Sequence, residues 1–231
     1  MGTDIHAAIE CFNGGRWQAH LFPNKYFGKW DDEKPETARL DIDRNYDAFA
    51  ILANVRNGRG FAGCVTSEPF QFMSDRRGVP DDISDEAKAA LSGEHSATYV
   101  TLAEMLAFDW TRTNTLTGYV NAVTFEQWDR CKRWQPRPKE YCGDVSGGTT
   151  QKISESAMRD LVQSVIGDKR GTEYQHAIQE LRDKHDRVYT RIFWEERYTE
   201  AAGQIWMEVF PLMLKLSQQF KDVRLVMDFD S

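Results

Sequence analysis

The chain has 231 residues, of which 41% are hydrophobic and 28% are charged. This length and composition suit one sizeable domain and exclude global disorder. The formal net charge of −7 argues against duplex nucleic acid as a partner, although it leaves room for a local basic pocket.

The cysteine spacing and the lengths of the hydrophobic runs indicate the cellular compartment in which the protein is expected. No two of the four cysteines form a C-x-x-C pair, so free thiols are expected rather than a zinc site or a disulfide framework. No apolar run approaches the roughly 18 residues of a membrane-spanning helix. We therefore expect a soluble cytoplasmic protein without a membrane partner, and homo-oligomerisation stays open.

The N-terminal segment predicts a hairpin followed by a loop. Residues 4–12 alternate as a strand, with Asp4 and His6 on the same side. A glycine turn then allows residues 16–22 to return as a second strand. Residues 23–44 are charged, contain two prolines and predict a long loop of the kind that often carries function.

The middle of the chain is predominantly helical. Asn45, Ser84 and Thr101 are suitable N-cap residues for three of the segments. Residues 57–82 are irregular, and residues 135–150 form a second long loop. The predicted helices span residues 46–55, 85–91, 102–108, 125–134, 154–166 and 173–186.

The C-terminal part returns to strand patterns. Residues 187–199 are rich in β-branched and aromatic residues, residues 200–219 are amphipathic with helical spacing, and residues 223–230 alternate as a closing strand. Strands therefore gather at the two ends and helices between them. This order predicts a single α+β domain over residues 1–231 whose terminal strands share one sheet.

Asp4 and His6 are the first candidates for chemistry. An Asp-x-His pair on one strand face supplies either two metal ligands or an acid that orients a general base. Metallophosphoesterases begin in this way, but their later Gly-Asn-His and Gly-His-x-His motifs are absent. The alternative is a solvated strand face with an incidental ion pair.

Asp228 and Asp230 lie on one face of the closing strand pattern. If the terminal strands are neighbours, these carboxylates join Asp4 and His6 in one cluster that would hold a divalent metal. The alternative is a polar C-terminal tail.

A Gly-x-Gly-x-x-Gly pattern at residues 58, 60 and 63 follows a helical segment rather than a strand, which excludes a dinucleotide-binding loop. Glycines still let a backbone approach an anion, and arginines donate to phosphate in pairs. We therefore expect Arg56 and Arg59, with Asn54 and Asn57 beside them, to bind a ligand. The alternative is a glycine-rich helix exit with solvated arginines.

Loop residues complete the candidate set. His95 lies in a predicted loop between two helices, where a histidine is available for proton transfer. Trp110 and Tyr141 would supply the flat surfaces that a nucleobase requires. The alternative is that these aromatic side chains belong to the core.

Several segments together resemble a widespread family of uncharacterised proteins encoded by bacteriophages and prophages. They include Asp4-Ile5-His6, the run from Ile51 to Gly58, Gly60-Phe61-Ala62-Gly63, His95-Ser96-Ala97 and Asp109-Trp110, and the resemblance spans nearly the whole chain. Thr3 departs from the Cys that is commoner in the family at that position. The resemblance implies a phage origin and a place of action in the host cytoplasm, but it brings no assigned activity.

Phage origin favours proteins that act on nucleic acids or nucleotides, or that counter host defence. Our first hypothesis is hydrolysis of a phosphodiester-type bond in a small or cyclic signalling nucleotide, which would be an anti-defence activity. In it, His6 or His95 acts as general acid or base, and Asp4 orients His6 or binds a metal. The arginines hold the phosphate groups. The alternative is a non-catalytic protein that sequesters such a nucleotide or inhibits a host protein.

Overall fold

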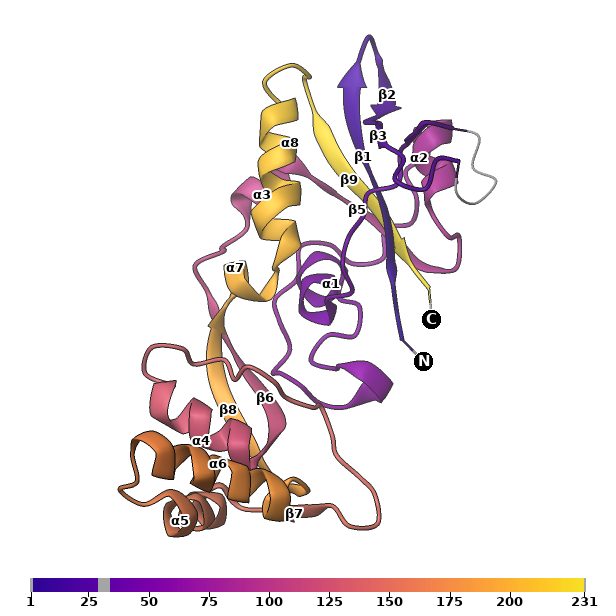
Figure 1. Cartoon of the computed structure of the whole chain (residues 1–231). Coiled ribbons are helices and arrows are strands. Elements are labelled where there is room, and N and C mark those ends of the chain that lie inside the picture. The colour runs from indigo at the N-terminus through magenta and orange to yellow at the C-terminus, as the bar shows by residue number, and fades with distance from the viewer. Residues whose placement is uncertain (1, 29–33, 231) are drawn as a thin grey trace. The chain divides into compact units, whose positions relative to one another are not determined.

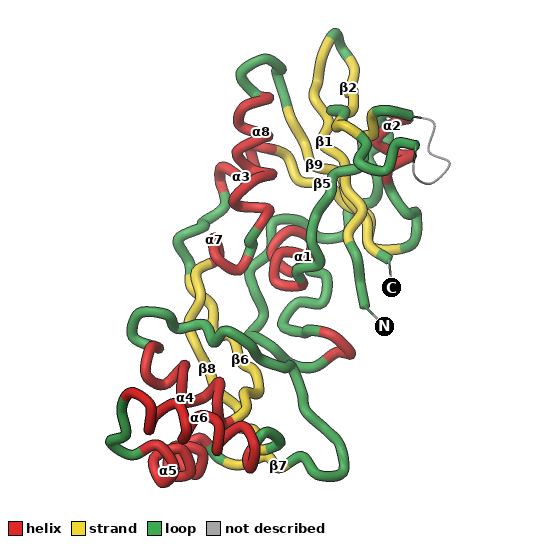
Figure 2. Tube along the Cα trace, viewed as in Figure 1, coloured by secondary structure: helices red, strands yellow, loops and turns green. Residues whose placement is uncertain are grey.

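The computed structural model describes residues 2–28 and 34–230 (Figure 1). The chain divides into two units, where composition favoured one domain. Unit 1 is formed by Met1–Gly58, Pro69–Arg112 and Arg197–Ser231, and unit 2 by Arg59–Glu68 and Thr113–Glu196. Each unit contains strands and helices (Figure 2).

Sheet A of unit 1 has the strand order β2-β1-β9-β5, and all neighbouring strands are antiparallel. The central strands are β1 (Ile5–Asn13) and β9 (Val223–Phe229). The edges are β2 (Arg16–Ala19) and β5 (His95–Thr101). The prediction that the first and last strands share one sheet is confirmed, and so is the α+β class.

Both faces of sheet A are covered. The face of Ile9 and Phe229 packs against α1 (Tyr46–Ala53), where the rings of Phe49 and Phe229 lie 5.3 Å apart. Helices α3 (Leu102–Ala107) and α8 (Phe210–Leu216) also contact β9 (Figure 1). The opposite face is covered by α2 (Asp85–Ala90), through a cluster of Ala8, Ala38 and Ala87. This second face also carries His6.

The helix expected over residues 200–219 is interrupted, so that prediction is wrong in part. A short helix α7 (Tyr198–Ala201) ends before Gly203, whose φ of 51° is left-handed. A π-helical turn η2 (Ile205–Val209) then leads into α8. Local backbone geometry at one glycine therefore overrides a continuous amphipathic pattern.

Short elements occupy the loops of the N-terminal half. Strand β3 (Phe22–Pro23) begins at the last residue of the expected strand 16–22 and pairs with β4 (Glu36–Thr37), which lies inside the expected loop 23–44. Residues 29–33 of that loop lie outside the described residues. A 3₁₀ turn η1 (Phe61–Gly63) contains the last glycine of the Gly-x-Gly-x-x-Gly pattern.

Unit 2 is built from a three-stranded sheet and three helices. The strand order is β6 (Thr113–Asn121), β8 (Val188–Arg197) and β7 (Gln151–Ile153), with β7 parallel to β8. Helices α4 (Ala122–Cys131), α5 (Glu155–Ile166) and α6 (Gly171–His185) contact one another around buried apolar residues. These include Phe125, Met158 and Leu181.

Two further predictions are tested by the fold. All four cysteines are free, as their spacing indicated, and burial raises the pKa of the Cys11 thiol to about 11. Among the described residues, no helix has the length and apolar character needed to span a bilayer.

Candidate functional site

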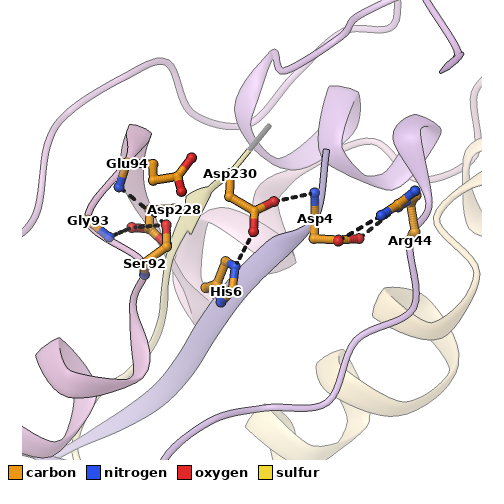
Figure 3. Close-up of polar contacts among 8 residues, drawn as sticks. All are labelled: Asp4, His6, Arg44, Ser92, Gly93, Glu94, Asp228 and Asp230. Atoms are coloured by element: carbon orange, nitrogen blue, oxygen red, sulfur yellow. Dashed lines mark hydrogen bonds and ion pairs between the residues drawn. The ribbon is translucent and has the colours of Figure 1, made fainter. Parts of the chain in front are cut away.

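The candidate site lies at the end of sheet A where β1 begins and β9 ends. The antiparallel register places His6 opposite Asp228 and Ile5 opposite Phe229. Asp230 follows the strand, and its backbone N–H donates to the carbonyl oxygen of Asp4. Residues more than 220 positions apart in the sequence therefore lie side by side (Figure 3).

Asp230 is the carboxylate that contacts His6. Its Oδ2 lies 2.9 Å from Nε2 of the imidazole, and its Oδ1 accepts the backbone N–H of Asp4 at 2.9 Å (Figure 3). The hydrogen bond with His6, followed by that from Asp4, lowers the pKa of Asp230 below its ordinary value. An ionised carboxylate only accepts hydrogen bonds, so Nε2 of His6 carries the proton.

This tautomer leaves the lone pair of His6 on Nδ1. Within residues 2–28 and 34–230, Nδ1 has no hydrogen-bond partner, and it is not among the buried polar atoms that lack one. The imidazole is 12% exposed and Asp230 is 32% exposed. The open nitrogen is therefore accessible to solvent, while the rest of the ring is held in place.

Asp4 has a different role from the expected one. Its two carboxylate oxygens accept Nε and Nη2 of Arg44, each at 2.7 Å, in a bidentate pair (Figure 3). The hydrogen bond with Arg44 lowers the pKa of Asp4. The group that orients His6 is consequently Asp230, and the expectation that Asp4 does so is wrong.

Asp228 is buried and its acceptor capacity is used by a turn. Its carboxylate accepts the backbone N–H groups of Ser92 and Gly93, at 3.0 and 2.5 Å, and the hydroxyl of Ser92 at 3.0 Å. The side chain is 1% exposed. Asp228 therefore fixes the Ser92–Glu94 turn against β9 (Figure 3).

The predicted metal set is not assembled. Asp4 is directed to Arg44, Asp228 to a turn and Asp230 to His6. No group of three His, Cys, Asp or Glu side chains suited to a metal occurs among the described residues. The four residues Asp4, His6, Asp228 and Asp230 thus do not fit a shared metal ion in this arrangement, because their lone pairs point to different partners.

Arg56 reaches the same end of the sheet. Its backbone is left-handed (φ 51°), its Nε donates to the Thr3 hydroxyl at 2.5 Å, and its guanidinium lies 5.0 Å from the ring centre of Tyr46. The Tyr46 hydroxyl in turn accepts the backbone N–H of Thr3 at 3.2 Å. Arg56 therefore contacts the residue that precedes Asp4.

The other members of the predicted arginine loop hold structure. The Asn57 amide accepts the N–H of Phe70 at 2.6 Å and donates to its carbonyl at 2.8 Å. It also donates to Asn54, whose left-handed backbone (φ 56°) ends α1. Arg59 belongs to unit 2, where its guanidinium donates to the carbonyl of Gly63 at 3.3 Å.

His95 is a strand residue, so its placement in a loop is wrong. It pairs with Phe229 at the start of β5, and its ring stacks on that of Phe229 at 6.4 Å. Register partners share a face, so His95 lies on the Phe229 face and His6 on the opposite one. Its Nδ1 is 2.9 Å from the hydroxyl of Ser96.

The two aromatic candidates lie in different units. Trp110 is a buried residue of unit 1; its Nε1 donates to the carbonyl of Met105 at 2.8 Å and its ring packs on Trp206. Tyr141 belongs to unit 2 and packs edge-on against Trp194 with ring centres 4.9 Å apart. For Trp110, the alternative of a core residue is confirmed.

Arg44 and Tyr46 were missed as site residues. They stand on either side of Asn45, which caps α1 through the N–H groups of Asp47 and Ala48. The capping signal was visible in the sequence, and it placed both neighbours at a fixed helix start. The contacts that their side chains make could not be predicted, because these contacts depend on the pairing of strands that are remote in the sequence.

The site therefore consists of a histidine–aspartate pair, with Arg44, Arg56 and Tyr46 arranged around Thr3 and Asp4. Comparison of the chain with family models, with curated proteins and with solved structures gave no match.

Proposed function

We propose that the protein hydrolyses a phosphodiester-type bond in a small nucleotide, with His6 as the general base and Asp230 as the residue that orients it. The observation that carries the proposal is the hydrogen bond from Nε2 of His6 to Asp230, with Nδ1 left open. In this arrangement Nδ1 takes a proton from water, the resulting hydroxide attacks phosphorus and the bond to the leaving oxygen breaks. The ionised Asp230 stabilises the imidazolium that forms.

Cationic side chains support an anionic substrate at this place. Arg56 is held beside Thr3, and Arg44 is held beside Asp4 with its side chain 47% exposed. Guanidinium groups fixed in this way bind phosphate oxygens with little loss of side-chain entropy. The phage resemblance makes cyclic and ADP-ribose-type signalling nucleotides the first substrates to test.

The direct test is product formation. The protein would be incubated with a panel of cyclic dinucleotides and ADP-ribose derivatives, with and without divalent cations, and products separated by chromatography. His6→Gln and Asp230→Asn should each lower kcat by about a hundredfold or more, since general bases contribute roughly 10²–10⁴. His176→Gln, an exposed histidine of α6, is the matched control and should retain full activity.

A second function is favoured by one observation, the limited exposure of the His6 ring at 12%. In this alternative the site binds a nucleotide without chemistry, and His6 only stabilises the end of the sheet. Thermal shifts distinguish the two. Sequestration predicts a nucleotide-dependent rise in Tm that Arg56→Ala removes and His6→Gln leaves, with the nucleotide recovered intact after denaturation. Intact nucleotide under every condition would rule out hydrolysis.

A further inference from the structure

A basic and aromatic segment of unit 2 has no part in the proposed chemistry. Between Asp129 and Glu140 every charged side chain is basic, in a chain with a net charge of −7. These residues are Arg130, Lys132, Arg133, Arg137 and Lys139. Unit 2 as a whole contains equal numbers of basic and acidic residues, so the segment is a local concentration of positive charge.

An exposed tryptophan lies within this segment. Trp134 follows the end of α4 and is 86% exposed, although its backbone N–H is fixed by the carbonyl of Cys131 at 2.8 Å. The Trp134 ring is therefore open to contact with a ligand. A flat ring between cationic side chains is the arrangement on which nucleic acid bases stack.

Two cavities adjoin the segment and share the residues Glu126 and Arg130. The first has a volume of about 330 Å³ and is lined by Trp128, Tyr174 and Lys139 among others. The second has a volume of about 300 Å³, and Arg159, Lys169 and Arg170 contribute to its lining. Positive side chains thus continue from one cavity to the next through Arg130.

Hydrogen bonds and a ring contact connect the residues between the two cavities. The buried carboxylate of Glu126 accepts Nη1 of Arg130 at 3.2 Å and the hydroxyl of Tyr174 at 2.7 Å. The Arg130 guanidinium lies 4.8 Å from the ring centre of Tyr174. The ring nitrogen of Trp128 donates to the carbonyl of Pro136 at 2.6 Å, which fixes the loop that carries Arg137 and Lys139.

Several cations in this region are available to an anion. In the part of the chain that the structure describes, no hydrogen bond or ion pair involves the side chains of Arg133, Lys139 or Arg170. Others are already paired, such as Arg159 with Asp129 at 3.1 Å. The basic segment and the two cavities together form a strip, in which the unpaired Lys139 lines the first cavity and the unpaired Arg170 lines the second. This distribution suits a ligand with several phosphates rather than one.

We propose that unit 2 binds single-stranded nucleic acid along this strip, with Trp134 as a stacking platform and Arg133, Lys139 and Arg170 contacting successive phosphates. Each small cavity suits one unstacked base. The bases of a duplex are already stacked on one another, so only the bases of a single strand can stack on the face of Trp134. This inference does not rest on the function proposed for unit 1.

Binding can be measured by fluorescence anisotropy of labelled oligo(dT) and oligo(U), with a duplex of mixed sequence as the third probe. The full chain should bind both single strands more tightly than the duplex, and affinity should fall steeply between about 50 and 200 mM salt. The two single-stranded probes distinguish DNA from RNA as the preferred form. A mononucleotide should compete only weakly.

Substitutions in the strip test which residues bind the nucleic acid. Trp134→Ala should weaken binding about tenfold without a change in salt dependence, whereas Lys139→Glu and Arg170→Glu should weaken it and reduce the salt slope by about one each. Phe193→Ala, an aromatic side chain that is 57% exposed on unit 2, and Lys221→Glu on unit 1 are matched controls and should bind like wild type. His6→Gln should also bind like wild type.

Circular dichroism is the check that each variant is folded, and the exposure of Trp134 should make its replacement harmless to the core. Three results would overturn the proposal: no binding by the wild type, equal binding of duplex and single strands, or unchanged binding by a folded Trp134→Ala variant.

Discussion

At the residue scale, the hydrogen bonds of Asp230 link stability to pH. The contacts with His6 and with the Asp4 backbone lower its pKa in the folded state. A group with a depressed folded pKa stabilises the protein above its unfolded value of about 3.9, and this contribution disappears as the pH falls further. Unit 1 should therefore lose stability progressively below about pH 4 as Asp230 becomes protonated.

Asp230→Asn should make the melting temperature less sensitive to pH in this acidic range, because it removes the titrating group. The measurement is thermal unfolding by circular dichroism between about pH 3 and pH 6. Asp160→Asn, an exposed position on α5, is the control and should retain the wild-type pH dependence. An unchanged acid dependence in Asp230→Asn would show that other carboxylates dominate.

A second residue-scale feature is the ion pair buried under α2. Nε of Arg224 donates to Glu10 at 2.8 Å, Nη1 donates to Asp82 at 2.7 Å, and the guanidinium lies 4.0 Å from the ring centre of Trp17. Glu10 is fully buried and also accepts the N–H of Ser84. Breaking such a pair leaves one charge buried without its partner.

Arg224→Met should therefore lower the free energy of unfolding by about 3–5 kcal/mol, as measured by urea denaturation. The double variant Glu10→Leu with Arg224→Met should recover much of that loss, because no uncompensated charge remains. Arg44→Met, which removes a half-exposed partner of Asp4, is the comparison and should have a much smaller effect. A double variant no more stable than the single one would contradict this account.

At the element scale, Gly203 separates α7 from η2 and also approaches the start of α1. A Cβ atom at this position would lie 3.0 Å from Nδ2 of Asn45, the residue whose Oδ1 caps α1. The left-handed backbone at φ 51° adds strain for any residue with a side chain.

Gly203→Ala should reduce the free energy of unfolding by about 1–2 kcal/mol, measured by chemical denaturation. Gly148→Ala is the matched control, since no atom lies within 4 Å of its Cβ position and its φ is not left-handed. Equal stability of the two variants would mean that Asn45 and the α7–η2 junction adapt without cost.

Elements with one clear period were predictable from the sequence. The alternation in β1, β8 and β9 gave their type and nearly their bounds, and Asn45, Ser84 and Thr101 cap helices where expected. β6 was missed because Thr113–Asn121 contains two asparagines and Gly118, residue types that are depleted in strands, and Gly118 leaves space for the ring of Tyr141. β5 was missed because Ser96 is left-handed and the register shifts between His95 and Thr98.

The candidate site was predictable in some of its members but not in its pairs. His6 and Asp230 were both named from strand alternation, yet which carboxylate meets the imidazole depends on the β1–β9 register. A shift by one residue would have turned Asp230 to the other face. Arg44 was not predicted as a site residue, because the loop that carries it has no periodicity from which the direction of a side chain follows.

At the scale of the whole molecule, two segments of unit 2, Arg59–Glu68 and Thr113–Glu196, are inserted into the sequence of unit 1. Hydrogen bonds between residues of unit 1 join the two ends of each insertion. The side-chain amide of Asn57 forms hydrogen bonds with the backbone of Phe70 and so joins the ends of the first insertion. The N–H of Tyr198 donates to the carbonyl of Arg112 at 2.9 Å and joins the ends of the second insertion. Sheet A and the helices that cover it need no strand from unit 2.

Replacing residues 113–196 by a short glycine-serine linker should therefore leave unit 1 folded. We expect a cooperative thermal transition and retained protection of β1 and β9 amides in hydrogen exchange, because the linker only has to join residues that are already adjacent. Exchange of these amides at the rate of an unfolded chain would show that unit 1 depends on unit 2.

The central pairing of sheet A also sets an order in time. β1 leaves the ribosome before its partner β9, which is made about 210 residues later. At about 5–20 residues per second, β1 waits roughly 10–40 s for the strand that completes the sheet. During that interval its long edge is unpaired and prone to association, so yield of soluble protein should depend on chaperones or low temperature during synthesis.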